Sequence, residues 1–357
     1  MLFHMEVVPG PAIQGWVLPN NPSGVPRVTI AHGDKLIEFE ANILRTDLRD
    51  RGMHDTGMAG FHITEEVIPD LPAVINDVEI RDVETGALLF RQFDPQKHVQ
   101  QKVFRFELQA MPHAQTEALF AQRFALSYGG IERQSFDTLF GILNNPAAVS
   151  LYACGRPSFQ RYEQLFRERD FKVLALLRDP FEEMAERLLF VRYAASPEAP
   201  PFLADHLSGL EPLAEFVKPI RFDDLESIRS AFNRMSDEQR AALSNPLVKA
   251  LACGPDEPPK SGHVEIALSK LARMSLVGLR SRFNEFKAVL PEVIGEDILG
   301  GHTLTTISWV ERLARDLRQV RAAKNVVSID LDLYGLAAEA VEDVIGPPQT
   351  TVEVVGA

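Results

Sequence analysis

The sequence predicts an α/β protein in which a small all-β sandwich domain, over residues 1–112, precedes a parallel sheet with flanking helices, over residues 118–346. Two observations predict this order. The first ~110 residues contain short strand-like runs separated by polar turns, which is typical of sandwiches. From about residue 118, three strand-like runs are each followed by a helical run, and this alternation is typical of a parallel sheet with crossover helices.

In the first domain, two hairpins are predicted. The runs "RVTIAHG" and "KLIEFEANIL" are separated by Gly33 and Asp34, and "VINDVEIRDVETGALLFRQF" turns at Thr85 and Gly86. Between the hairpins, a connection rich in glycine and charge leads into a predicted strand around Phe61.

The second domain is predicted from three strand-and-helix pairs: "RFALSY" with "SFDTLFGILNN", "AVSLYACG" with "SFQRYEQLFRERD", and "KVLALL" with "FEEMAERLLFVRYAA". Ligands of parallel sheets bind beyond the carboxyl ends of the strands. We therefore expect the functional residues within 127–135, 154–158 and 178–180.

The remainder of the chain is mostly helical. Four prolines at 196–212 predict a loop, and a helical insert follows at about 200–260, where Ser236 and Gln239 have the form of a capping box. A long charged helix is predicted at 306–323, then a short extended piece that leads into a helix up to about residue 346. The tail at 347–357 is predicted to be loose.

Composition limits the function classes. Hydrophobic residues make up 45% of the chain, charged residues 24%, and the formal net charge is −13. Such acidity disfavours nucleic acid and anionic membrane surfaces as partners. No run approaches the roughly 18 apolar residues of a membrane span, and the start lacks a secretory signal. We therefore expect a cytoplasmic protein with no membrane span and no nucleic-acid partner.

Neither cysteines nor other ligand types predict a metal. Cys154 and Cys253 are too few for a disulfide framework or a cysteine zinc site, and both are expected in the core. No cluster of His, Asp and Glu has convincing ligand spacing.

Three segments resemble carbohydrate sulfotransferases. "KVLALLRDPFEEMAERLLF" looks like their strand, loop and helix with Arg, Asx and Pro in sequence; "LVGLRSRFNEFKAVLPEVIG" is similar to a later segment, and "SIDLDLYGLAAEAV" to the closing helix. They occur in the family's order over roughly residues 120–346. The resemblance implies a P-loop-like sulfotransferase fold, with transfer of a sulfuryl group from phosphoadenosine phosphosulfate to a carbohydrate hydroxyl and no metal.

The resemblance also implies site residues. The donor's 5′-phosphosulfate would lie on the first strand-to-helix loop, placed here at 127–135, where backbone N–H groups and a helix start hold it. Gly129, Gly130, Gln134 and Ser135 are the binding candidates in this loop. Arg133, its only cation, is the catalytic candidate that would neutralise charge on the leaving oxygen. The donor's 3′-phosphate would contact Arg178 and a serine eight positions on.

Further candidates lie at neighbouring strand ends. Arg156 is expected on the same edge as Arg133 and Arg178, and three arginines there predict an anion pocket that all three guanidinium groups face. Arg280 and Arg282 are further candidates from the late basic segment. His302, after two glycines, is the candidate base.

The sequence departs from the family pattern at two positions, and several of the candidate residues also have purely structural explanations. The loop "YGGIERQSF" has no lysine, and Glu186 stands where the family has serine. Its carboxylate would repel a 3′-phosphate if it pointed inward; the alternative is that Glu186 faces solvent and Ala185 occupies the position. The two glycines can simply form a turn, Ser135 can be a helix N-cap, and Asp179 can cap the helix that begins at Pro180.

The N-terminal domain adds a second, looser resemblance. Its pattern of Gly15-Trp16, Arg45-x-Asp47-Leu48 and Gly60-Phe61 resembles accessory β-sandwich modules of glycosyltransferases and other bacterial envelope-polysaccharide enzymes. Two functions stay open. One is a sulfotransferase acting on a carbohydrate or lipid-linked sugar. The other is a sulfotransferase-like protein without transfer activity, which binds a nucleotide, a glycan or a protein partner in polysaccharide assembly. A glycosyltransferase is a third possibility.

Overall fold

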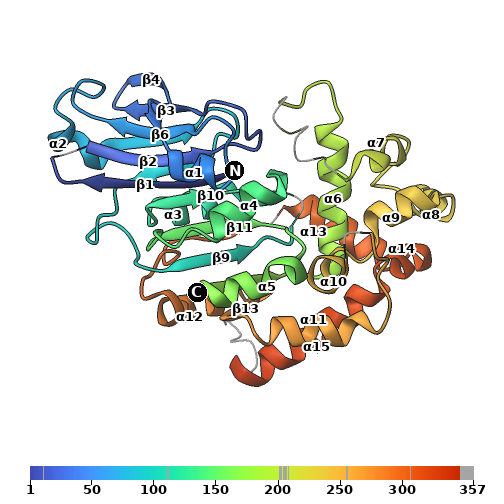
Figure 1. The fold of residues 1–357 in the computed structure, drawn as a ribbon. Coiled ribbons are helices and arrows are strands. Elements are labelled where there is room, and N and C mark those ends of the chain that lie inside the picture. Colours follow the sequence, from blue (N-terminus) through green and yellow to red (C-terminus); the bar gives the residue numbers. More distant parts are fainter. Residues whose placement is uncertain are drawn as a thin grey trace.

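The computed structural model describes residues 1–345 except 11, 110, 112, 201, 202, 204–206, 208, 255 and 306. Within these residues the protein is α/β, with a five-stranded parallel sheet, flanking helices and two small antiparallel sheets near the N-terminus. Figure 1 shows the antiparallel sheets beside the β10 edge of the parallel sheet, and a group of helices beyond the carboxyl ends of its strands.

The two antiparallel sheets comprise eight strands. One has the order β1 (Leu2–Val8), β2 (Ala12–Leu18), β6 (Met58–Ile63), β5 (Ile43–Leu44); the other has the order β4 (Lys35–Glu40), β3 (Arg27–His32), β7 (Val78–Asp82), β8 (Leu88–Arg91). Both predicted hairpins are confirmed, as β3–β4 and β7–β8. Two short helices, α1 (Thr46–Asp50) and α2 (Leu71–Val74), lie in the connections. Phe39 of β4 and Phe61 of β6 pack with ring centroids 6.4 Å apart, so the two sheets share a core.

The parallel sheet has the order β10 (Leu126–Tyr128), β11 (Leu151–Gly155), β9 (Lys102–Phe106), β12 (Phe171–Leu177), β13 (Leu276–Leu279). The three predicted strands are confirmed as β10, β11 and β12. The sequence analysis missed β9 and β13. β9 falls within the range 1–112, yet it pairs in parallel with both β11 and β12 and forms the centre of this sheet.

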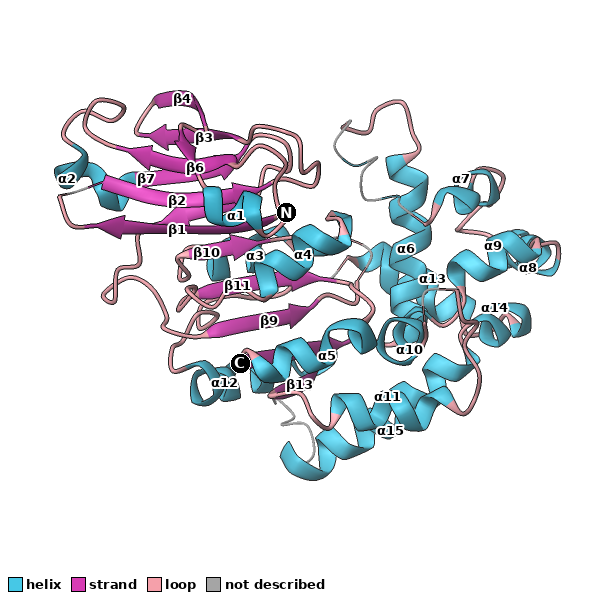
Figure 2. Ribbon diagram, viewed as in Figure 1, coloured by secondary structure: helices cyan, strands magenta, loops and turns pink. Residues whose placement is uncertain are grey.

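Helices cover both faces of the parallel sheet (Figure 2). On one face, α3 (Ala114–Ala121) and α12 (Phe283–Ile294) share a core with Val103 of β9. On the other face, Phe104 of β9 stacks on Phe166 of α5 (Phe159–Glu168), with centroids 4.4 Å apart. Adjacent strand residues point to opposite faces, so both faces of β9 are buried, and the Val103 face also carries Arg105, which is buried and pairs with Glu107. The helices α4 (Phe136–Leu143), α11 (His263–Leu271) and α15 (Ser328–Ile345) contribute to this second core.

A separate helical core lies beyond the strands' carboxyl ends. It packs α6 (Pro180–Ala194) against α7 (Glu211–Val217), α8 (Leu225–Asn233), α13 (Ser308–Leu317) and α14 (Arg321–Val326). The predicted insert contributes α7, α8, α9 (Asp237–Leu243) and α10 (Pro246–Ala252), and the capping box of Ser236 and Gln239 is confirmed.

Two predictions about the C-terminal region are wrong. The single long helix expected at 306–323 is two helices, α13 and α14, because the chain breaks at residues 318–320 so that Leu317 and Val320 can both enter the helical core. A short extended piece was expected from residue 325, before the last helix. Residues 325 and 326 instead form the end of α14, and α15 begins at Ser328. The tail at 347–357 lies outside the described residues, and within them no helix is both long and apolar enough to cross a bilayer.

Candidate functional site

The sheet topology places the candidate site at the carboxyl end of β9. The chain leaves β9 for α3 on one face of the sheet, whereas it leaves the neighbouring β11 for α5 on the opposite face. Adjacent strands whose connections diverge in this way leave a crevice between them, where ligands of open α/β sheets bind. The loops after β9, β11 and β12 bring Leu108, Arg156 and Arg178 to this edge.

The same topology corrects the position of the first strand-to-helix loop. We predicted it at 127–135, after β10, but β9 precedes β10 in the same sheet. The first loop is therefore residues 107–113, between β9 and α3, of which 110 and 112 lie outside the described residues. The prediction was wrong because the strand-like run at 102–106 lies within the range that the N-terminal strands led us to assign to the first domain.

Within the loop at 127–135, the glycine and serine candidates have the structural roles that the sequence also allowed, in a turn and at a helix N-cap. Gly130 has a φ of +59° and begins a 3-10 turn at Ile131–Arg133, and Gly129 lies beside the Glu117 carboxylate. Ser135 is the predicted N-cap: its hydroxyl accepts a hydrogen bond from the Thr138 backbone N–H, with 3.2 Å between N and O. Gln134 lies in extended backbone between the turn and this cap.

Arg133 folds back over its own turn. Its Nε donates a hydrogen bond to the Gly130 carbonyl at 3.3 Å, and its guanidinium lies against Gly130 where a β-carbon would otherwise be. The side chain is exposed and lines a cavity at the sheet edge together with Arg156. Two of the three arginines predicted to share a pocket therefore do so.

This cationic cavity has a volume of about 360 Å³. It lies between the β10 and β11 loops, α6, and the α9–α10 segment of the helical insert. Its charged lining consists of four cations and one carboxylate: Arg133, Arg156, Arg187, Lys249 and Glu132. A cavity with excess positive charge on a chain of net charge −13 is a local reversal of the protein's overall field.

Arg156 is the half-buried cation of this cavity, whereas Arg133 and Lys249 are exposed. Its backbone N–H donates to Glu132 Oε2 at 3.0 Å, but its guanidinium makes no hydrogen bond or ion pair with any residue that the structure describes. Burial, together with the nearby Arg187 guanidinium, lowers the pKa of Arg156. Arg187 itself donates to Glu183 Oε1 at 2.9 Å, so its charge is matched.

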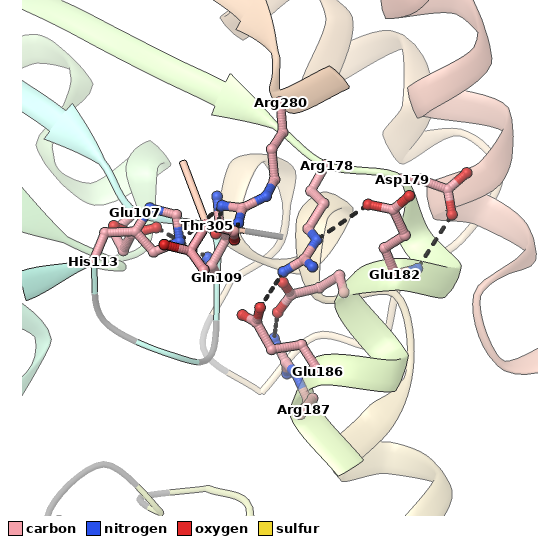
Figure 3. Close-up of polar contacts among 11 residues, drawn as sticks. Glu107, Gln109, His113, Arg178, Asp179, Glu182, Glu186, Arg187, Arg280 and Thr305 are labelled. Carbon is pink, nitrogen blue, oxygen red and sulfur yellow. Dashed lines mark hydrogen bonds and ion pairs between the residues drawn. The ribbon is translucent and has the colours of Figure 1, made fainter. Parts of the chain in front are cut away.

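Arg178 is in the opposite situation. Its guanidinium is buried and forms ion pairs with Glu186 and, at 3.4 Å, with Glu182 (Figure 3). It does not line the cationic cavity, and its charge is directed at α6. Burial and the neighbouring Glu183 carboxylate raise the pKa of Glu186. Glu186 thus points inward, at the guanidinium that the resemblance assigned to a phosphate.

Asp179 and Pro180 have the capping roles that the sequence predicted. The Asp179 carboxylate accepts hydrogen bonds from the backbone N–H groups of Phe181 and Glu182, at 2.9 and 3.2 Å, and Pro180 is the first residue of α6. These contacts explain the Asp-Pro pair without any ligand.

A second cavity, of about 190 Å³, lies at the start of α3. His302 lines it and its Nε2 lies 3.0 Å from the Thr116 hydroxyl. Arg280 donates to Gln109 Oε1 at 2.8 Å and to His113 Nε2 at 2.9 Å, and Figure 3 shows these three side chains converging. Burial lowers the pKa of His113 to about 4, so this imidazole is neutral near pH 7 and accepts from Arg280.

The remaining predicted residue, Arg282, lines neither cavity. It is buried at the start of α12 and pairs with Glu285, with 3.2 Å between Nε and Oε1. His302 and Arg133 lie in different cavities, so the two predicted catalytic residues are not brought together.

Sequence reasoning missed Arg187, Lys249 and His113. Arg187 and Lys249 reach the cavity from α6 and α10, and a helical pattern alone does not say which face meets the sheet edge. His113 was missed together with the first loop. No family model matches the chain, and no curated protein sequence matches it significantly. Among the described residues, no group of three or more His, Cys, Asp or Glu is arranged to hold a metal ion.

Proposed function

We propose that this chain is a sulfotransferase-like protein that binds the phosphate or sulfate group of a nucleotide or sugar in the cationic cavity. In this proposal Arg178 binds no donor, and no sulfuryl group is transferred there. The unmatched guanidinium of Arg156 carries the proposal. A half-buried charge without a partner costs free energy, and an anionic ligand would offset that cost. Arginine also presents paired N–H groups that suit phosphate and sulfate oxygens.

The size and lining of the cavity fit this ligand class. A volume of about 360 Å³ lies within the range of small-molecule sites. Alanine and proline side chains of α9 and α10, together with Leu108 and Leu210, provide an apolar wall beside the four cations. Such a wall suits the ring of a sugar or a base next to its charged group. The fold we propose is P-loop-like, because the Arg-Asp-Pro loop follows the strand next to the central β9.

Two observations disfavour phosphoadenosine phosphosulfate as a donor. The carboxylate of Glu186 already occupies the guanidinium of Arg178. The loop after β9, residues 107–113, contains no lysine or arginine to neutralise a leaving phosphosulfate. Of the two functions that the sequence left open, these observations favour the sulfotransferase-like protein that binds a ligand without transfer activity.

Calorimetric titration with a sugar phosphate tests this function. We expect wild-type protein to bind glucose 1-phosphate and inorganic sulfate competitively, and Arg156→Gln to weaken both by about tenfold or more, the loss of one charge-assisted contact. Arg167→Gln is the matched control, because Arg167 is an exposed arginine on α5, the helix that follows Arg156. Equal affinities in wild type and Arg156→Gln would rule the cavity out as the binding site.

Sulfuryl transfer is the second candidate, favoured by the cavity at the start of α3. This cavity is lined both by residues of the loop after the central strand and by His302, the candidate base. Titration with adenosine 3′,5′-bisphosphate separates the two functions. Binding that survives Arg156→Gln but is lost in Arg280→Gln would place a donor at α3 and favour the transferase.

A further inference from the structure

A cysteine, a histidine and a glutamate form a hydrogen-bonded chain at the wall of the cationic cavity. Cys253 lines the cavity at the end of α10, and its Sγ lies 3.3 Å from Nδ1 of His263. The other ring nitrogen, Nε2, lies 3.2 Å from Glu257 Oε1. A nucleophile within reach of a base, which is in turn oriented by a carboxylate, is the arrangement that activates catalytic thiols and hydroxyls.

The backbone sets the tautomer of His263. The Lys260 N–H donates to Nδ1 at 3.1 Å, so Nδ1 carries the lone pair and Nε2 carries the proton that points at Glu257. Glu257 is held in turn by the Gly254 N–H, which donates to its Oε2 at 3.3 Å. The unprotonated Nδ1 therefore lies within reach of the thiol, and its lone pair is shared between the Lys260 N–H and the Cys253 S–H.

The end of α10 is also tied to the arginine loop. The Ser158 hydroxyl donates to the Cys253 carbonyl at 3.5 Å, and Ser158 is two residues beyond Arg156. Cys253, Ser158 and Arg156 all line the same cavity. A ligand whose anionic group meets Arg156 is thus held in the cavity that Cys253 lines, although Cys253 itself is buried, with 1% of its surface exposed.

We propose that Cys253, His263 and Glu257 form a nucleophilic triad that attacks the acyl carbon of an anionic ester or acyl phosphate bound in the cationic cavity. Cys253 is the nucleophile, His263 the general base, and Glu257 a positioning residue. The anionic character of the substrate rests on the proposed function; the triad itself rests only on the contacts of these three side chains.

Acetyl phosphate is the smallest substrate of this class. Sγ attacks the carbonyl carbon and the S–C bond forms. The bond between that carbon and the bridging oxygen then breaks, and inorganic phosphate leaves with this oxygen. The thiol proton passes to Nδ1 of His263 and from there to the leaving phosphate. Water, deprotonated by the same imidazole, then hydrolyses the thioester to acetate and restores the thiol.

The second cysteine is an internal comparison within the same chain. Cys154 is buried in β11, its Sγ donates to Glu117 Oε1 at 3.0 Å, and burial raises its pKa to about 12. Burial also raises the pKa of Cys253, so both thiols are neutral near pH 7. Only Cys253 has an imidazole within reach to accept its proton during attack.

The first experiment is site-resolved mass spectrometry of the full chain after incubation with acetyl phosphate or iodoacetamide. We expect both reagents to modify Cys253 at least about tenfold faster than Cys154 in the folded protein. Equal or lower reactivity of Cys253 overturns the triad, and this result needs no variant.

The second experiment measures the iodoacetamide rate at Cys253 against pH. We expect His263→Gln to lower the rate roughly 100-fold near pH 7, the usual scale of a general base, and Glu257→Gln to lower it by a smaller factor. Both deficits should shrink at alkaline pH, once the thiol ionises without assistance. Glu265→Gln, an exposed carboxylate of α11, is the matched control. A deficit that is the same at every pH would indicate a structural role and contradict the assignment.

The two proposals fail separately. If Arg156→Gln abolishes sugar-phosphate binding while Cys253 proves inert, the anion site stands and the triad is wrong. If Cys253 reacts with iodoacetamide as expected but acetyl phosphate modifies wild type and Arg156→Gln equally fast, the triad stands and the anionic substrate class is wrong.

Discussion

The ends of β11 and β12 each present an arginine at the same edge of the sheet, with opposite surroundings. At β12, the guanidinium of Arg178 is matched by two carboxylates of α6. At β11, the guanidinium of Arg156 has no partner among the described residues and faces a cavity with three further cations. Position at a strand end is therefore insufficient to identify an anion site, because the charge of the surrounding helices decides whether a ligand is needed.

The largest expected difference between the two ends is in stability. Arg178→Ala leaves Glu186 buried without its cation, which costs about 3–5 kcal/mol of unfolding free energy. Arg156→Gln removes a charge that has no partner, so we expect little loss or a small gain. Urea denaturation of both variants gives the comparison. Similar destabilisation by the two substitutions would mean that Arg156 is also held by a protein partner.

The Arg178 side should show a pH dependence of stability. Asp330 accepts N–H groups of Leu247 and Val248, shares a small cavity with Arg178, and burial raises its pKa from 3.8 to about 7. A raised carboxyl pKa means that the folded state binds the proton more tightly than the unfolded state, so this stabilising contribution is complete below about pH 4 and is lost as pH rises through 7.

Asp330→Asn removes that dependence. We expect the unfolding free energy of wild type to fall by about 3–4 kcal/mol more than that of the variant between pH 4 and pH 7.5. Asp332→Asn, on the exposed face of the same helix, should keep the wild-type pH profile. Identical profiles for the two variants would show that Asp330 does not titrate in this window.

Ligand-dependent stabilisation belongs to the Arg156 side. A sugar phosphate at 100 times its Kd should stabilise wild type by about 2.7 kcal/mol in thermal unfolding, and should stabilise Arg156→Gln much less. The stabilisation should weaken as salt concentration rises, because the cavity is open to solvent ions. Full stabilisation of Arg156→Gln would relocate the ligand.

The smallest expected effect is at the rim of the cavity. Lys249 lines it but is exposed, so its attraction for an anion is screened by water. We expect Lys249→Gln to weaken sugar-phosphate binding by only about two- to threefold, measured by the same titration. A loss as large as that of Arg156→Gln would move the centre of the site from the sheet edge to α10.

The local features of the fold were predictable, whereas its central strand was not. The caps at Ser135, Asp179 and Ser236 and the two hairpin turns were all predicted. Each depends on residues within four positions of one another. The run at 102–106 has no comparable local mark, because a strand's membership in one sheet or another is decided by distant partners.

The candidate site was predictable in part. The strand ends at 154–158 and 178–180 were expected at one edge, and the parallel sheet brings them there. The wall formed by α9 and α10 was not expected, because these two helices are separated from β11 by more than 80 residues and their orientation depends on packing. The pairing of Cys253 with His263 was equally hidden, since it requires the turn at 254–262 to reverse the chain.

By itself, the sequence determined the alternation of strands and helices, the caps and the presence of arginines at strand ends, because these follow from hydrogen bonds and apolar periodicity over a few residues. Only the tertiary structure decided which arginine is neutralised. Arg178 has Glu182 and Glu186 on the adjoining turns of α6, while Arg156 meets the cationic face of elements from elsewhere in the chain. The electrostatic state of a side chain depends on every charge that packing brings within a few ångströms, and that sum is a property of the folded chain.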